Sequence, residues 1–178
     1  SWRGPLQTGV SLEDYSDGAE LDPNPEWEKA VNGRGTPIIF KGRVYSWGYR
    51  GEGPDLEEVL TCYDEQSGET IWEAAYHDFI SDTIYDRYSI GAAAVDPETE
   101  NVYLATTYGL VVCFDKDGKE QWKHSMIERF GRLTFPNGRA GAPVIDGGIL
   151  IIRGVTSYWG ADGPARDRFF GFDKKSGD

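Results

Sequence analysis

The chain has 178 residues, of which 39% are hydrophobic and 27% charged, and its formal net charge is −12 at pH 7. This length suits one large domain or two small ones with a buried core, and the composition excludes a disordered tail. The acidic balance argues against a nucleic-acid-binding protein, and apolar runs such as residues 149–152 are too short to cross a bilayer. The 23 glycines, 10 tyrosines and 6 tryptophans suggest an all-β protein with many short strands.

The chain opens with an acidic leading segment, residues 1–26. It starts at Ser1 and its single methionine is Met126, a pattern expected of a mature exported protein or of a fragment. The acidic residues of this segment lack the alternating spacing of a calcium-binding loop. The two cysteines and two histidines have no spacing typical of zinc or haem, so no metal site is predicted.

An apolar run that ends in an aromatic residue and an aspartate occurs three times. The copies are residues 59–64, 110–115 and 168–173. A turn containing a glycine follows each copy, at Gly68, Gly118 and Gly177. The first two copies reach a tryptophan four residues after the glycine, at Trp72 and Trp122. Each copy therefore predicts a strand, a tight turn and a second strand.

A second pattern precedes each copy, at residues 35–40, 91–95 and 141–145, and leads through a turn into another strand. One unit thus has four strands, A to D. Tandem four-stranded units, here about 50 residues apart, are typical of β-propeller blades. We therefore predict an all-β, partial propeller with about three to four blades. Its parts are the leading segment 1–26 and the propeller 27–178, divided into a D strand at 27–34, blades at 35–76 and 90–126, and an incomplete blade at 141–178.

The segment from Cys62 to Trp72 resembles the tryptophan-docking motif of quinoprotein-type propellers, the PQQ-like repeat family. The motif is a small residue, an aspartate, a Ser/Thr-Gly pair and a tryptophan at fixed spacing, and all of these positions match. Residues 113–122 match with one turn residue deleted, and residues 171–177 form a truncated copy. The resemblance implies a PQQ-like propeller of the outer-membrane assembly lipoprotein type. Because one fold hosts many functions, it implies the fold more strongly than an activity.

The motif has a physical logic. The glycine allows a positive φ in the turn between strands C and D, the aspartate accepts hydrogen bonds from turn amides, and the indole buries a large apolar face. We expect structural roles for Asp64, Gly68, Trp72, Asp115, Gly118, Trp122, Asp173 and Gly177. Cys62 and Cys113 occupy equivalent positions on neighbouring blades, so we expect two buried thiols and no disulfide between them.

Antiparallel topology places the A–B and C–D turns at one end of the blades and the longer B–C and D–A loops at the other. Loops on a rigid scaffold commonly carry function. The candidate ligand-binding residues of this loop face are Arg50, Arg87, Tyr88, Arg132, Asn137, Arg139, Tyr158 and Trp159. Charge is uneven: residues 1–100 hold 7 Lys+Arg against 21 Asp+Glu, and residues 101–178 hold 11 against 9. The arginines of the second part suit either solvation or an anionic partner.

The sequence shows no catalytic set, so the first hypothesis is an exported, non-catalytic binding or assembly scaffold, periplasmic or extracellular, without catalytic residues or a cofactor. Its expected partners are proteins or missing blades that complete the propeller, with no nucleic acid and no transmembrane segment. An alternative is a fragment of an alcohol or sugar dehydrogenase that uses pyrroloquinoline quinone (PQQ) and calcium. A third possibility is a structural subunit of a larger extracellular assembly.

Overall fold

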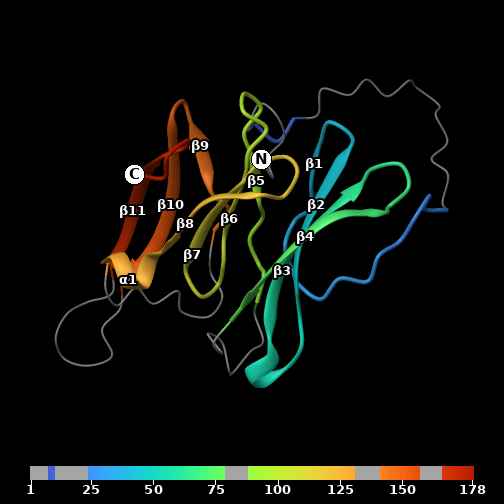
Figure 1. Ribbon diagram of the computed structural model, residues 1–178, viewed down its shortest axis with the longest axis horizontal. Coiled ribbons are helices and arrows are strands. Elements are labelled where there is room, and N and C mark those ends of the chain that lie inside the picture. The colour runs from blue at the N-terminus through green and yellow to red at the C-terminus, as the bar shows by residue number, and fades with distance from the viewer. Residues whose placement is uncertain (1–7, 11–23, 79–87, 131–140, 157–165) are drawn as a thin grey trace.

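Three antiparallel sheets follow one another in chain order in the computed structural model (Figure 1), which describes residues 8–10, 24–78, 88–130, 141–156 and 166–178. The first sheet contains β1 Ile38–Phe40, β2 Arg43–Arg50, β3 Glu57–Asp64 and β4 Thr70–His77. The second contains β5 Ala94–Val95, β6 Val102–Ala105, β7 Leu110–Phe114 and β8 Glu120–Ser125. The third contains β9 Val144–Asp146, β10 Ile149–Thr156 and β11 Arg166–Asp173.

Each sheet is a meander in which consecutive strands pair. Lys41 and Gly42 join β1 to β2, and both have positive φ, +47° and +75°, as in the tight hairpin turns that match strand twist. The two four-stranded sheets repeat the same irregularity, a bulge beside the cysteine of the C strand, at Cys62/Tyr63 and at Cys113/Phe114. The all-β fold with successive four-stranded antiparallel blades is therefore confirmed.

The core lies between the sheets rather than within one of them. Alternate residues of each strand face opposite neighbours, because side chains in a strand alternate between its two faces. Leu60 and Cys62 of the first blade pack with Val112 and Phe114 of the second. The next junction repeats this with other side chains: Tyr103, Val111 and Cys113 of the second blade, and Leu150, Ile152 and Phe172 of the third. Each blade therefore depends on its neighbours for burial.

Two elements differ from the expectations. A five-residue helix, α1 Met126–Phe130, follows β8 and begins where the Ser125 hydroxyl accepts the Glu128 amide at 3.2 Å. Serine is a preferred N-cap, and this local signal was overlooked in a β-rich sequence. Residues 27–34, expected as a D strand, form only an isolated bridge between Asn32 and Tyr49. A strand needs a ladder partner, and within the described ranges no C strand pairs with this segment.

A short 3₁₀ turn, Gly53–Asp55, lies between β2 and β3. None of the helices in the described part of the chain is long and apolar enough to span a membrane.

Candidate functional site: blade junctions and loop face

Three tryptophan rings lie on three turn glycines, and each glycine belongs to the blade that follows the tryptophan. A Cβ atom placed on Gly68, Gly118 or Gly177 would lie 2.6–2.7 Å from the ring of its tryptophan. The pairs are Trp27 with Gly68, Trp72 with Gly118, and Trp122 with Gly177. The glycines have φ of +68°, +84° and +79°, the positive values that the sequence predicts. Glycine is required here for two reasons: the backbone has a positive φ, and a Cβ atom would collide with the tryptophan ring.

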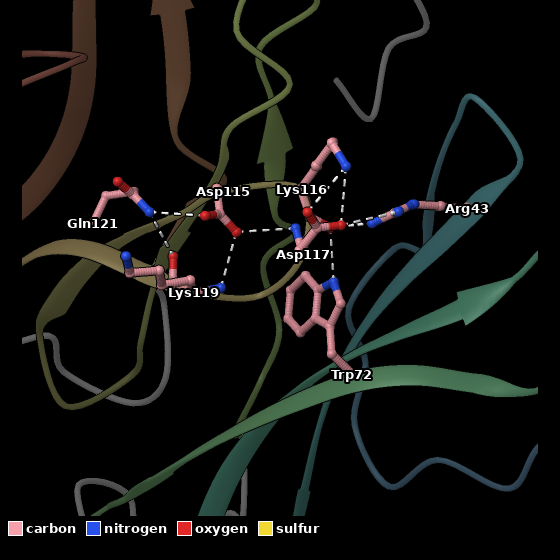
Figure 2. Close-up of polar contacts among 7 residues, drawn as sticks. All are labelled: Arg43, Trp72, Asp115, Lys116, Asp117, Lys119 and Gln121. Atoms are coloured by element: carbon pink, nitrogen blue, oxygen red, sulfur yellow. Dashed lines mark hydrogen bonds and ion pairs between the residues drawn. The ribbon is translucent and has the colours of Figure 1, made fainter.

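Each indole also donates a hydrogen bond to a carbonyl oxygen of the same turn. Figure 2 shows the central junction, where Trp72 Nε1 donates to the Lys116 carbonyl at 3.0 Å. The equivalent bonds are Trp27 Nε1 to Glu65 O at 2.8 Å and Trp122 Nε1 to Lys174 O at 3.3 Å. A buried indole needs such an acceptor, so ring stacking and hydrogen bonding together connect consecutive blades.

The motif aspartates organise the turns internally. Asp115 Oδ1 accepts the amides of Asp117 and Lys119, both at 3.0 Å, and its other oxygen accepts Gln121 Nε2 at 2.9 Å (Figure 2). Asp64 accepts the Gln66 and Ser67 amides, and the bonds from Ser67 hold the pKa of this carboxyl below its usual value. Asp173 does the same in the third turn and its pKa is also lowered, mainly by the Ser176 amide.

A second donor joins each of the two later junctions, and sequence reasoning did not find it. Arg43 Nη1 donates to the Lys116 carbonyl, and Nη2 lies 3.4 Å from Asp117 Oδ1 (Figure 2). At the next junction the Tyr103 hydroxyl donates to the Lys174 carbonyl at 2.9 Å. At each of these two junctions one turn carbonyl, of Lys116 or Lys174, accepts two hydrogen bonds. One donor is the tryptophan indole, and the other is a different side chain at each junction.

Lys174 forms a buried ion pair across the junction of the second and third blades. Its Nζ lies 2.8 Å from Asp96 Oδ2 and 2.7 Å from Glu98 Oε2, and the lysine and aspartate side chains are 5% and 3% exposed. Burial opposes the ionised form of Asp96, but the bonds from Lys174 and Thr99 prevail and its pKa is lowered. The Lys174 pKa is raised by its bonds to Asp96 and Glu98. Each charge of a buried ion pair is compensated by the other, so removing one partner leaves an uncompensated charge and destabilises the fold.

The opposite end of the first sheet carries exposed charges. Arg50 ends β2, and its guanidinium binds Glu57 at 3.1 Å and Glu73 at 2.6 Å. His77 ends β4 and lies 3.6 Å from Glu57, with 77% of its side chain exposed. We call Arg50, Glu57, Glu73 and His77 the rim cluster.

Beneath the rim cluster, the Glu58 carboxylate connects the first two blades. Glu58 is 1% exposed and Ser89 and Thr107 are fully buried. The Ser89 and Thr107 amides donate to Glu58 at 2.9 and 2.7 Å, and the Thr107 hydroxyl lies 2.5 Å from Oε1. Burial raises the pKa of Glu58 from 4.5 to about 7, assisted by the nearby Asp78 and opposed by the Thr107 and Ser89 bonds. Ser89 has a φ of +53°, so this contact holds an uncommon backbone conformation.

Two of the eight candidate loop-face residues are described. Arg50 lies in the exposed rim cluster, whereas Tyr88 is 2% exposed and packs edge-on against Tyr49 at 5.5 Å between centroids. The two are therefore not on one accessible surface. Arg87, Arg132, Asn137, Arg139, Tyr158 and Trp159 lie outside the described residues. Glu58 was missed, although strand alternation places it on the same face as Leu60 and Cys62, which is a detectable signal.

The cysteines show no sign of reactivity. Cys62 and Cys113 are free and buried, and burial raises the pKa of both thiols, that of Cys113 to about 12. Both therefore remain protonated at neutral pH. Among the described residues no group of three or more His, Cys, Asp or Glu side chains is arranged to hold a metal ion.

Solved structures with a similar fold include a methanol dehydrogenase and two quinohemoprotein alcohol dehydrogenases. A europium-containing methanol dehydrogenase aligns with a TM-score of 0.58 and 16% identity over 84% of this chain and 24% of its own. The quinohemoprotein alcohol dehydrogenase ADHIIG from Pseudomonas putida HK5 aligns with a TM-score of 0.52 and 20% identity, over 85% of this chain and 20% of its own. The quinohemoprotein alcohol dehydrogenase from Comamonas testosteroni aligns with a TM-score of 0.50 and 23% identity, over 86% of this chain and 21% of its own. These likenesses concern the fold, and the chain spans about a quarter or less of each structure.

No curated protein sequence gives a significant match. A family model does: the PQQ-like repeat model described as outer membrane protein assembly factor BamB matches residues 56–178, more than half of the chain. This range contains the turns of all three blades and two of the three docked tryptophans. The chain therefore belongs to the PQQ-like repeat family of β-propeller proteins.

Proposed function

We propose that this chain is part of an exported, periplasmic or extracellular PQQ-like propeller that acts as a binding and assembly scaffold for other polypeptides. The observation that carries the proposal is the pairing of a fixed interior with an exposed rim. Glu58 binds Ser89 and Thr107 from the next blade, and directly beside it the Arg50 guanidinium and the His77 imidazole are exposed to solvent. A surface whose supports are already ordered loses little entropy when a partner binds.

The description of the matched family model supports a polypeptide partner, because that family is named for outer-membrane protein assembly. In addition, the ionised groups that meet between blades are engaged in structural contacts, such as Lys174 with Asp96 and Arg43 with the Lys116 carbonyl. On this proposal, residues 27–178 form the propeller arc and the loop end is its binding surface.

The alternative is a segment of a PQQ- and calcium-dependent alcohol dehydrogenase, and it is supported by the fold likeness to a methanol dehydrogenase and two quinohemoprotein alcohol dehydrogenases. This alternative predicts catalysis on addition of the quinone and calcium. The scaffold proposal predicts polypeptide binding without them.

The test measures both properties on the full chain. An unfolded outer-membrane β-barrel polypeptide, diluted from urea onto the immobilised protein, should bind saturably. Arg50→Glu should weaken this binding about 10-fold, because it replaces the cation of the rim cluster with a third carboxylate. Lys119→Glu, on an exposed turn at the other end of the second blade, is the matched control and should bind normally. Quinone- and calcium-dependent dye reduction with an alcohol, together with absent polypeptide binding, would overturn the proposal.

A further inference from the structure

Three parts of the chain that are distant in sequence meet at the Glu58 carboxylate. Glu58 lies in β3, Ser89 lies in the connection between β4 and β5, and Thr107 lies in the turn between β6 and β7. The Ser89 and Thr107 amides donate to different oxygens of this carboxylate, and both hydroxyls also lie within hydrogen-bond distance of Oε1. Glu58 therefore fastens two loops at the loop end of the second blade to the first blade. We call Glu58, Ser89 and Thr107 the Glu58 cluster.

Ser89 is held in an uncommon backbone conformation by these bonds. Its φ is +53°, in the region that residues with a side chain rarely adopt. Its hydroxyl also lies 2.7 Å from the Gly48 carbonyl oxygen, and its own carbonyl accepts the Arg34 amide at 3.2 Å. A strained residue keeps its conformation only while its surroundings fix it, so loss of the bonds to Glu58 would allow Ser89 to relax.

A second carboxyl group is buried beside the cluster. Glu58 is 1% exposed, and Asp78, which directly follows β4, is 2% exposed. Burial disfavours the charged form of Glu58 and the Asp78 charge adds to this effect, so the pKa of Glu58 is raised from 4.5 to about 7. The other titratable side chains next to the cluster are tyrosines, a residue type that is ordinarily neutral near pH 7: Tyr49 and Tyr76 opposite Glu58 in the sheet, and Tyr88 and Tyr108 beside the two loop residues. The charged rim cluster lies on the other face of the sheet, because side chains alternate along a strand.

We propose that the Glu58 cluster is a pH-sensitive contact that releases the two loops as the pH rises toward neutrality, while both blades stay folded. In the opened state Glu58 is in water and has its ordinary pKa of 4.5, whereas in the closed state its pKa is about 7. The closed state therefore binds a proton that the open state loses, and opening becomes easier as the pH rises between these values. The ratio of open to closed molecules should increase about 10-fold per pH unit, about 300-fold in total, and then level off.

The surrounding structure allows these loops to open by themselves. Neither Ser89 nor Thr107 belongs to a strand. The apolar contacts between the two blades, such as those of Cys62 with Phe114, lie further along the strands, and the docking of Trp72 on Gly118 fastens the opposite end. Loops with few apolar contacts open at a lower free energy than core strands, so opening at the loop end leaves this junction in place.

Hydrogen exchange of single amides in the full chain, followed by NMR from pH 4 to 8, tests the proposal. When closing is faster than exchange, base catalysis alone raises the exchange rate of an amide about 10-fold per pH unit. The Ser89 and Thr107 amides should show about 100-fold per unit up to pH 7 and the ordinary slope above it. Amides of β10, in the third sheet, should keep the ordinary slope. The two loop amides should also exchange faster than the Val112 amide of β7, because their opening requires no unfolding.

Three variants assign the effect to Glu58. Glu58→Gln cannot ionise, so Ser89 and Thr107 should return to the ordinary slope. His77→Gln is the matched control, because histidine also changes charge near neutral pH and His77 lies in the adjacent rim cluster, and it should keep the steep slope. Thr107→Val removes a hydroxyl bond that lowers the pKa of Glu58, so the steep range should extend above pH 7.

The ordinary slope at Ser89 and Thr107 in the wild type, or a steep slope that persists in Glu58→Gln, would overturn the inference. Exchange of the two loop amides at the rate of the Val112 amide would also overturn it, because the loops would then open only when the blades unfold. No partner polypeptide is present in these measurements, so their outcome is independent of the proposed scaffold function.

Discussion

At the scale of single residues, Glu58 shows how a buried acid can join two blades. The Ser89 hydroxyl has one proton and two acceptors within reach, Gly48 O at 2.7 Å and Glu58 Oε1 at 3.1 Å. Both oxygens of Glu58 also accept backbone amides, from Ser89 and Thr107, and these bonds favour the carboxylate. Burial outweighs them and raises the pKa to about 7, so the folded state holds the neutral acid below that pH.

The sign of the resulting pH dependence is unusual for a carboxyl group. Its folded-state pKa of about 7 lies above its ordinary value of 4.5, so between these values the folded state binds more protons than the unfolded state. Stability should fall as pH rises through this window, by about 3 kcal/mol, and should then level off. Urea unfolding across this range should show the slope in the wild type and lose most of it in Glu58→Gln. Glu69→Gln, at an exposed turn, should keep the slope, and an equal slope in Glu58→Gln would contradict the assignment.

The turn glycines allow two requirements to be separated. Gly118 has a positive φ and a tryptophan ring where its Cβ would lie, whereas Gly147 has a φ of +54° and open space around it. Gly147→Ala should cost about 1–2 kcal/mol, which is the backbone penalty alone. Gly118→Ala should cost about 1–3 kcal/mol more, because the Trp72 ring must move. Denaturant unfolding of both variants measures this difference, and equal losses would remove the close approach of the ring from the explanation.

At the scale of elements, the junction between the second and third blades depends on one buried cation. Lys174 occupies a turn after β11, and its partner Asp96 directly follows β5. Lys174→Met keeps the volume and leaves Asp96 buried without its partner, so the free energy of unfolding should fall by about 3–5 kcal/mol. Lys175→Met, one residue later and exposed, should change it by less than about 0.5 kcal/mol. A loss below about 1 kcal/mol for Lys174→Met would show that Asp96 is solvated by other means.

The elements that sequence reasoning predicted are those whose residues carry a local signal. Turn glycines adopt a positive φ and turn aspartates accept the amides of their own turn, and both requirements are local in sequence. The C–D turns of all three blades could therefore be predicted from Gly68, Gly118 and Gly177. The second donors at the junctions were not found, because Arg43 in one blade and Tyr103 in the next fill the same role with unrelated side chains. Contacts made between blades are set by packing rather than by local pattern, and the bonds of Glu58 to Ser89 and Thr107 are of this kind.

At the scale of the whole molecule, each sheet is stabilised by the apolar contacts that it makes with the neighbouring sheet. The first and third sheets each pack on the second, so the arc behaves as a one-dimensional array in which each unit is stabilised by the next. Within the described residues the second sheet has a packed neighbour on each side, and each of the other two sheets packs on the second. Loss of one junction should therefore release one blade rather than unfold the arc at once.

Hydrogen exchange tests this directly. Trp122 contacts Phe172, lies on Gly177 and donates to the Lys174 carbonyl, so it is the main clamp on the third sheet. In Trp122→Ala, exchange in β10 and β11 should accelerate about 10-fold or more, while β2 and β3 should change by less than about threefold. Trp72→Ala is the reciprocal variant and should release the first sheet instead. If either variant accelerated exchange equally in all three sheets, the blades would unfold as one cooperative unit and the neighbour-by-neighbour account of the arc would be wrong.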